Sequence, residues 1–199
     1  MTDASSQART PAAARPTPSG ARRWTRLAGR SSLYCALLLP VSLAALAAAI
    51  AGRRGSAVAW WRGLRVRLLD GSAVPARQPR TTAVVAHALV SLALGLVALV
   101  PLGVQVLFVL RGLLYGLVDR GPYDHSWGGP SRGGAWVAHI AAGIPEVLAA
   151  LAVLVGIAAL HQRLTASLDG VRRPRWLLPT VAMTVLATAL LFVAWTRQL

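Results

Sequence analysis

The chain has 199 residues, of which 55% are hydrophobic and 14% charged, and its 21 basic and six acidic residues give a formal net charge of +15. Soluble domains carry about 25% charged residues, so this composition argues against an ordinary water-soluble enzyme. The single cysteine, Cys35, excludes an internal disulfide and a cysteine-based zinc site. A basic chain can bind nucleic acid, but the arginines here flank long apolar runs and form no single binding face.

Residues 1–32 are rich in Ala, Arg, Pro, Ser and Thr and have few large apolar side chains. They cannot bury enough surface to offset chain entropy, which predicts a disordered basic tail. A cleaved signal peptide is the alternative, because basic residues precede the apolar run at 33–50 and small residues follow it. The run is longer than a usual signal core, which favours a retained membrane span.

Four apolar segments predict an all-α, polytopic integral membrane protein, with a transmembrane domain over 33–199. The expected transmembrane helices cover about 33–51, 82–118, 135–160 and 176–195. As one helix the second segment would be roughly 55 Å long, which exceeds the hydrocarbon thickness of a bilayer. We therefore expect a tilted or proline-kinked helix that projects from the membrane at one end.

Two segments that follow spans, 60–71 and 160–170, both end in Leu-Asp-Gly and repeat leucine or tryptophan at helical spacing. This pattern predicts two short amphipathic helices that lie on the bilayer surface. Their aspartates could pair with the arginines that follow them, or Asp-Gly could be a simple turn. The residues singled out on these helices are Trp60, Trp61, Arg62, Arg65, Asp70, Arg163 and Asp169.

The arginine count beside each span places 52–81 and 161–175 in the cytoplasm and 119–134 outside. This orientation puts the basic tail outside as well, which conflicts with its charge. The first span could be re-entrant, the tail could cross despite its charge, or the topology could be inverted. The sequence leaves these alternatives open.

The predicted outer loop is rich in Gly and Pro and favours tight turns. Its acidic and histidine residues could gather a cation, although their spacing fits no established metal motif, and a structural cap is the favoured interpretation. The loop residues proposed for sensing or structure are Asp119, Tyr123, Asp124, His125, Trp127, Gly128, Gly129 and Pro130.

Glu146 lies near the middle of the third predicted span, where an ionised group costs at least about 2.5 kcal/mol. If the second and third spans pack antiparallel, Gln105 lies at the same depth in the membrane as Glu146, and Arg111 lies near the depth of His139. We predict a buried polar seam of these four residues. It could be a proton- or ligand-responsive switch, but interhelical contacts that fix the register are the favoured interpretation. His87 and His161 are expected at the interface.

The sequence contains no Ser/His/Asp set, phosphate-binding glycine loop or HExxH motif, so no enzymatic activity is expected. We expect no cofactor and no metal.

The run YGLVDRGPYDHSWGGPSRGGAWVAHI at 115–140, with the two Leu-Asp-Gly segments, resembles the sensor domain family of GC-rich Gram-positive bacteria. That family is a polytopic membrane module, often fused to a sensor histidine kinase and sometimes standing alone. The resemblance covers roughly 30–199, and the Trp-Gly-Gly-Pro loop is its most specific part. The chain departs from the family in having room for only one good span over 33–61, and it shows no kinase motifs.

The resemblance implies a sensory or accessory module of a two-component or other signalling system, located in the cell membrane without catalytic activity. The lipid bilayer and a separate histidine kinase or other membrane signalling protein are the expected partners. A nucleic-acid partner is not expected, and homo-oligomerisation stays open. The alternative is a transporter or channel component that uses the intramembrane Glu146.

Overall fold

The structure, a computed structural model, describes residues 20–69, 71 and 79–197, and every regular element among them is helical. This confirms the predicted all-α class. The elements in chain order are α1 (Gly20–Ile50), α2 (Arg54–Leu69), α3 (Thr81–Leu107), the π-helical segment η1 (Phe108–Leu113), α4 (Tyr115–Val118), α5 (Arg132–Leu168) and α6 (Leu177–Thr196).

Three stretches in the described part of the chain are long and apolar enough to cross a membrane: Gly20–Ile50, Thr81–Leu113 and Arg132–Leu168. A shorter apolar stretch, Leu177–Leu191, lies in α6. The fourth expected span is therefore present as a helix, but its apolar stretch is shorter than the other three.

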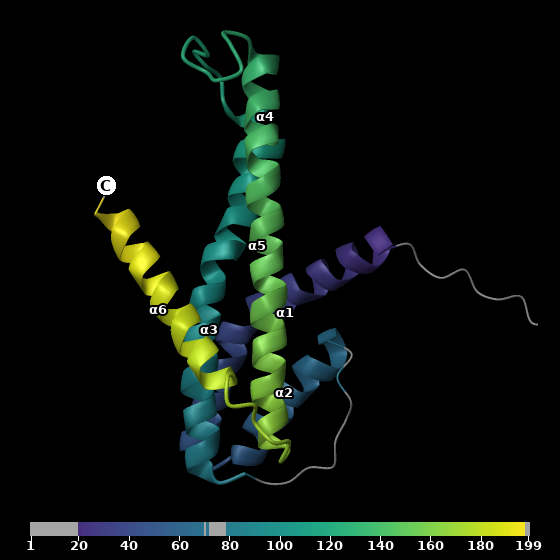
Figure 1. Cartoon of the computed structure of the whole chain (residues 1–199), viewed down its shortest axis with the longest axis vertical. Coiled ribbons are helices and arrows are strands. Elements are labelled where there is room, and N and C mark those ends of the chain that lie inside the picture. The colour runs from purple at the N-terminus through teal and green to yellow at the C-terminus, as the bar shows by residue number, and fades with distance from the viewer. Residues whose placement is uncertain (1–19, 70, 72–78, 198–199) are drawn as a thin grey trace, which may run out of the picture.

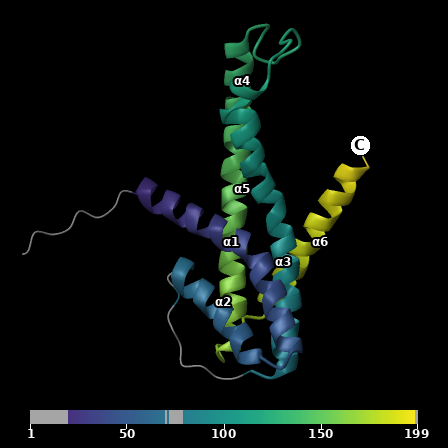
Figure 2. The ribbon, with the colours of Figure 1, turned by 180° about the vertical axis from the view of Figure 1, so that it is seen from behind.

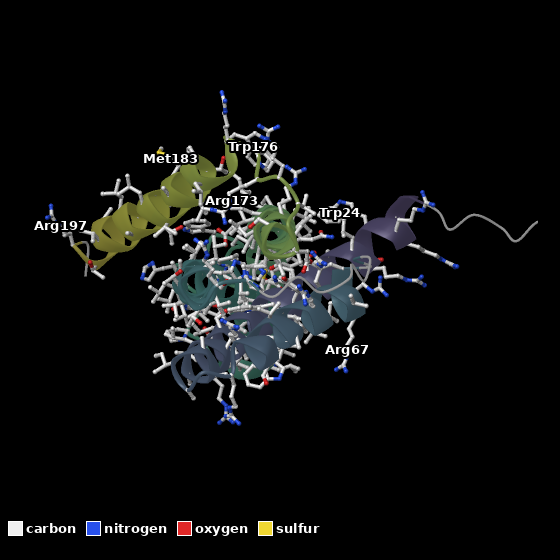
Figure 3. All side chains as sticks on the ribbon, turned by 90° about the horizontal axis from the view of Figure 1, so that it is seen from below. Trp24, Arg67, Arg173, Trp176, Met183 and Arg197 are labelled. Carbon is white, nitrogen blue, oxygen red and sulfur yellow. The ribbon has the colours of Figure 1, made fainter. Side chains whose placement is uncertain are left out.

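The longest feature is an antiparallel hairpin of α3–η1–α4 against α5 (Figure 1). The loop at 119–131 closes the hairpin at one end, well beyond the ends of the other helices (Figures 1 and 2). At the opposite end α1 and α2 pack against the hairpin. Seen along the long axis, α6 diverges to one side and the start of α1 extends to the other (Figure 3).

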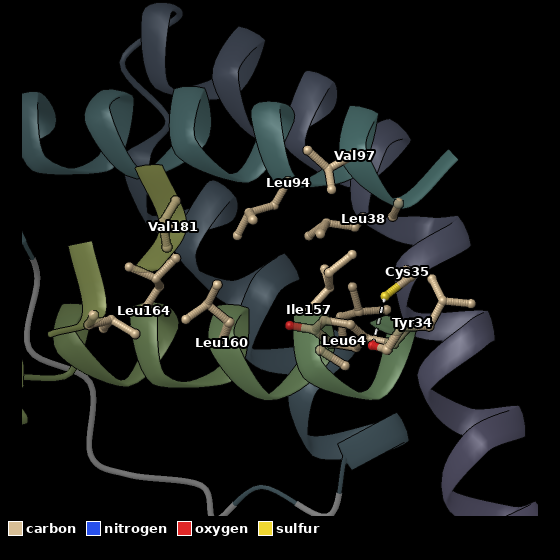
Figure 4. Packing of buried hydrophobic residues seen from close by; sticks show 14 residues of the cluster. Tyr34, Cys35, Leu38, Leu64, Leu94, Val97, Ile157, Leu160, Leu164 and Val181 are labelled. Atoms are coloured by element: carbon tan, nitrogen blue, oxygen red, sulfur yellow. Dashed lines mark hydrogen bonds between the residues drawn. The ribbon is translucent and has the colours of Figure 1, made fainter. Parts of the chain in front are cut away.

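The main hydrophobic core lies where α1, α2, α3, α5 and α6 meet, and not in the projecting part of the hairpin (Figure 4). Tyr34, Leu38, Leu94 and Leu154 are fully buried there. The backbones of α1 and α3 approach closely at Gly95, where a Cβ atom would lie 3.0 Å from the Cα of Leu39. Small residues allow such approach between membrane helices, which gain stability from close packing.

The second expected span is one nearly continuous helical segment, as predicted, but its irregularity is not at Pro101. Pro101 is buried inside the regular α3 helix. The helical geometry changes at η1 and breaks at Leu114, whose φ and ψ are −100° and 1°. A π-helical turn of this kind widens the helix locally and is common at functional sites.

Two boundary predictions are wrong. Helix α1 begins at Gly20, so residues 20–32 of the expected disordered tail are helical; arginine and alanine are good helix formers. Residues 1–19 lie outside the described part of the chain. The second expected surface helix, 160–170, is the last part of the unbroken α5 helix. Its leucines at i, i+4 and i+8 face the bundle core, where Leu160, Leu164 and Leu168 are buried.

We expect Gly95→Leu to destabilise the bundle, because the new side chain would force α1 and α3 apart. Overpacking of this kind typically costs about 1–3 kcal/mol. Gly103→Leu is the matched control, since among the described residues no atom of another helix lies within 4 Å of a Cβ placed there. Thermal unfolding in mild detergent should show a lower melting temperature for Gly95→Leu alone. Equal melting temperatures for the two variants would contradict the close α1–α3 contact.

Candidate functional site

A cavity of about 630 Å³ lies in the projecting part of the hairpin, between η1, α5 and the loop that joins them. We call it the hairpin cavity. Its wall combines apolar and aromatic side chains with several groups that can carry charge or donate hydrogen bonds. The polar and ionisable lining residues include Arg111, Tyr115, Tyr123, His125, His139 and Glu146.

The phenyl ring of Phe108 packs between η1 and α5. A Cβ atom at Gly143 of α5 would lie 2.5 Å from the ring, and one at Gly112 would lie 3.0 Å from it. The ring therefore fits between the two helices only because both positions are glycine. The ring thus forms the packing contact between Gly112 of η1 and Gly143 of α5.

Trp136 stabilises the broken end of η1. Its indole Nε1 donates hydrogen bonds to the carbonyl oxygens of Gly112 at 3.0 Å and Leu113 at 3.2 Å. A helix break leaves such carbonyls without intrahelical donors. The indole ring also packs on Gly116, where a Cβ atom would lie 2.5 Å from it. One side chain of α5 thus fixes the position of both η1 and α4.

His139 lies in the cavity wall with a defined ring orientation. Its imidazole stacks on Tyr115, with ring centroids 3.8 Å apart and an interplanar angle of 14°. Its Nδ1 lies 2.8 Å from the carbonyl oxygen of Ala135. A carbonyl only accepts, so Nδ1 carries the proton of this bond. In the neutral ring the acceptor is therefore Nε2.

The loop is held by its own hydrogen bonds. The Tyr123 hydroxyl donates to the Asp119 carbonyl oxygen at 2.7 Å, and the Gly121 N–H donates to the Asp119 carboxylate at 3.0 Å. This N–H, followed by the neighbouring Tyr115 hydroxyl, lowers the pKa of Asp119, which is therefore ionised at neutral pH.

The loop also packs tightly on the first turn of α5. A Cβ atom at Gly128 would lie 1.9 Å from the Gly134 carbonyl oxygen, and one at Gly134 would lie 2.0 Å from the Gly128 carbonyl oxygen. The Ser131 hydroxyl accepts a hydrogen bond from the Gly134 N–H at 3.1 Å and caps the helix. The Gly-rich composition thus closes the loop over the cavity.

The structure brings three of the four predicted seam residues to one site, but not as a buried seam. Arg111, His139 and Glu146 line the hairpin cavity, and Arg111 and Glu146 are exposed. Within the described residues no ion pair involves Glu146. The predicted burial is wrong because α1, α2 and α6 do not contact η1, so no further described helix covers this part of the hairpin.

Gln105 does not line the hairpin cavity. Its side-chain amide donates to the Ser32 hydroxyl of α1 at 3.3 Å. The prediction for Gln105 considered only the depth of residues on the two hairpin helices. Helix α1 also packs on α3, and its Ser32 is the hydrogen-bond partner of Gln105.

The predicted loop residues divide into two groups. Tyr123, His125 and Trp127 contribute to the cavity wall. The other five, Asp119, Asp124, Gly128, Gly129 and Pro130, do not line it. No group of three or more His, Cys, Asp or Glu residues in the described part of the chain could hold a metal ion.

The expectation that His87 and His161 lie at the interface is wrong, because both are buried in the bundle. His161 is 0% exposed. Its Nδ1 lies 2.6 Å from the Tyr34 hydroxyl, and its Nε2 lies 2.8 Å from the Ser91 hydroxyl. We call Tyr34, His87, Ser91, His161 and Thr165 the polar cluster. It joins α1, α3 and α5.

The hydrogen bonds of the polar cluster are complete with His161 neutral. The Ser91 hydroxyl donates to the His87 carbonyl oxygen at 2.7 Å, so it can only accept from His161 Nε2–H. Nδ1 then accepts from the Tyr34 hydroxyl. The sequence signal was present: His87 and Ser91, like His161 and Thr165, are four residues apart and share a helix face. It did not show which helix each face would meet.

The first predicted surface helix forms as α2, but one of its faces packs into the bundle. Trp61 is 0% exposed, its indole N–H lies 3.5 Å from the Ser42 hydroxyl, and its ring meets His87 edge-on. Trp60 is exposed. Asp70 lies outside the described residues.

In the C-terminal half of the molecule, the Arg163 guanidinium lies 4.8 Å from the Trp176 ring centroid.

Arg62 and Arg65 of α2 both pair with Asp169, which follows α5. The Arg65–Asp169 distance is 3.0 Å, and the Asp169 side chain is 0% exposed. The alternative that Asp169 pairs with Arg172 or Arg173 is wrong. The chain turns at Gly170, whose φ is +88°, and Arg173 donates instead to the Ser167 hydroxyl at 3.1 Å.

Comparison of the chain with protein-family models finds no match. Comparisons with curated proteins and with solved structures find none either. The resemblance to the sensor domain family therefore rests on the sequence features alone.

We expect His161→Leu to destabilise the protein, because it leaves the Tyr34 hydroxyl buried without its acceptor and Ser91 without its donor. Each unsatisfied buried group costs about 1–3 kcal/mol. His125→Leu is the control, since His125 is exposed in the loop, and such a change stays within about 0.5 kcal/mol. Thermal unfolding in detergent checks this. A melting temperature of His161→Leu equal to that of the unaltered protein would show that the polar cluster contributes no stability.

Proposed function

We propose that this protein is a multi-pass protein of the cell membrane that acts as a sensory or accessory module of a membrane signalling system, without catalytic activity of its own. The observation that carries the proposal is the path of α5. This unbroken helix contributes His139 and Glu146 to the hairpin cavity and ends at Leu168, beside the Asp169 ion pairs.

The hairpin cavity is suited to receive a small ligand. It offers a guanidinium at Arg111, a carboxyl group at Glu146 and an acceptor nitrogen at His139, beside the apolar ring of Phe108. A few convergent polar groups on a largely apolar wall are typical of ligand sites. Arg111 and Glu146 both line the cavity, so a ligand within it can reach both groups.

The other end of α5 is suited to transmit a shift. The Asp169 carboxylate is buried and held by two arginines of α2, Arg62 and Arg65. Helix shifts of about 1–2 Å are enough for signalling across interfaces. A shift of α5 of this size would strain or break a buried ion pair, which responds steeply to geometry. The signal would thus pass from the cavity through α5 to α2.

The partner in this proposal is a separate histidine kinase or another membrane signalling protein. Exposed arginines lie on α2 and on the connections that precede α2 and α6. These are Arg53, Arg54, Arg67, Arg172 and Arg175. This charge favours an acidic surface on the partner.

Partner capture tests the proposal. The tagged protein is cross-linked in cells that express it natively, purified in mild detergent and analysed by mass spectrometry. We expect a histidine kinase or another signalling protein to be enriched over an unrelated multi-pass control. Asp169→Asn should reduce this recovery several-fold because it weakens both ion pairs. Asp124→Asn, which removes an exposed carboxylate from the loop, should not reduce it.

Two outcomes would contradict the proposal. One is the recovery of no signalling protein under any condition. The other is an ion or solute flux in proteoliposomes that Glu146→Gln abolishes, which would identify a transporter or channel component instead.

A further inference from the structure

A second cavity, of about 410 Å³, lies where the first half of α1 meets the end of α2 and the C-terminal half of α5. We call it the fork cavity, because α1 and α2 diverge on this side of the hairpin (Figure 1). It shares no lining residue with the hairpin cavity. Its polar lining residues are Arg23, Arg26, Arg30, Ser31 and Gln162.

The three arginines form a basic stripe along one face of α1. Arg23, Arg26 and Arg30 follow at spacings of three and four residues, which places their guanidinium groups on the same side of the helix. Among the residues that the structure describes, no Asp or Glu lines the fork cavity. The site therefore favours an anion, and the planar guanidinium fork suits phosphate oxygens.

Ser31 supplies an independent indication of a ligand. Its side chain is 1% exposed, yet its hydroxyl has no hydrogen-bond partner among the described residues. The next residue, Ser32, by contrast donates to the Ala28 carbonyl oxygen at 3.0 Å. A buried hydroxyl without a partner costs about 1–3 kcal/mol, so an acceptor oxygen in the cavity would relieve that cost.

The rest of the cavity wall is apolar. Leu27, Leu68, Leu69, Val155, Ala158 and Ala159 line it. A free phosphate ion would leave this surface uncovered, whereas an acyl chain would pack against it. The arginines also precede the apolar run that begins at Leu33, which is where basic side chains meet lipid headgroups.

We propose that the fork cavity binds one anionic phospholipid. Its phosphate is held by Arg23, Arg26 and Arg30 with hydrogen bonds from Ser31 and Gln162, and the start of its acyl chain lies along the leucines of α1 and α2. This proposal does not depend on the signalling role, since the two cavities are separate.

Native mass spectrometry of the full chain in mild detergent tests the proposal, with phosphatidylglycerol, phosphatidylcholine and inorganic phosphate as separate probes. The site variant is Arg23→Gln/Arg26→Gln/Arg30→Gln. The charge-matched control is Arg53→Gln/Arg54→Gln/Arg67→Gln, three exposed arginines outside the cavity. Two further variants leave the charge unchanged: Ser31→Ala, and Ala159→Trp, which fills the apolar part. Circular dichroism verifies that each variant keeps its helices.

We expect one bound phosphatidylglycerol, with its affinity reduced about tenfold or more in the site variant and less than threefold in the control. Ser31→Ala should weaken binding about threefold or more, and Ala159→Trp should weaken it by a similar factor. Equal losses in the two arginine variants would show general charge attraction and overturn the proposal. So would equal binding of phosphatidylcholine, or competition by millimolar inorganic phosphate, which would identify a plain anion site. Unchanged binding in both Ser31→Ala and Ala159→Trp would also overturn it.

Discussion

The arrangement of the helices depends on the hydrogen bonds of His161. Between apolar helices a polar side chain cannot exchange its bonds for water, so it must find partners on neighbouring helices. His161 of α5 meets Tyr34 of α1 at 2.6 Å and Ser91 of α3 at 2.8 Å. These two contacts fix where the three long helices cross. The leucines around them then pack into the main core.

The position of this crossing explains why the hairpin projects. Helices α1, α2 and α6 cover one end of the α3–α5 pair (Figures 1 and 2). Beyond them, in the described part of the chain, η1, α4, the first part of α5 and the loop at 119–131 pack on one another. That end is held by other means: Trp136 bonds the last carbonyls of η1, Phe108 fits between two glycines, and Ser131 caps α5. The hairpin cavity lies among these supports, and α5 connects it to the Asp169 ion pairs.

The sequence predicted the helices well and the interhelical contacts poorly. Long apolar runs identify membrane helices because the bilayer requires them. The antiparallel register of two helices also predicted that Arg111, His139 and Glu146 would approach each other. The partners of Gln105, His87 and His161 depend on where α1 crosses, which no pattern within one helix contains. The π-helical turn likewise depends on packing, and no other described helix covers η1, so Arg111, His139 and Glu146 line a cavity instead of a buried seam.

The account requires that the α3–α5 hairpin crosses the bilayer, with its loop on one side and α2 on the other. Single cysteines at His125 and at Arg53, which directly precedes α2, both exposed positions, in a Cys35→Ala background test this directly with a membrane-impermeant maleimide. The account predicts that intact cells label one of the two positions and that the other reacts only after permeabilisation. Equal labelling of both positions in intact cells would contradict it.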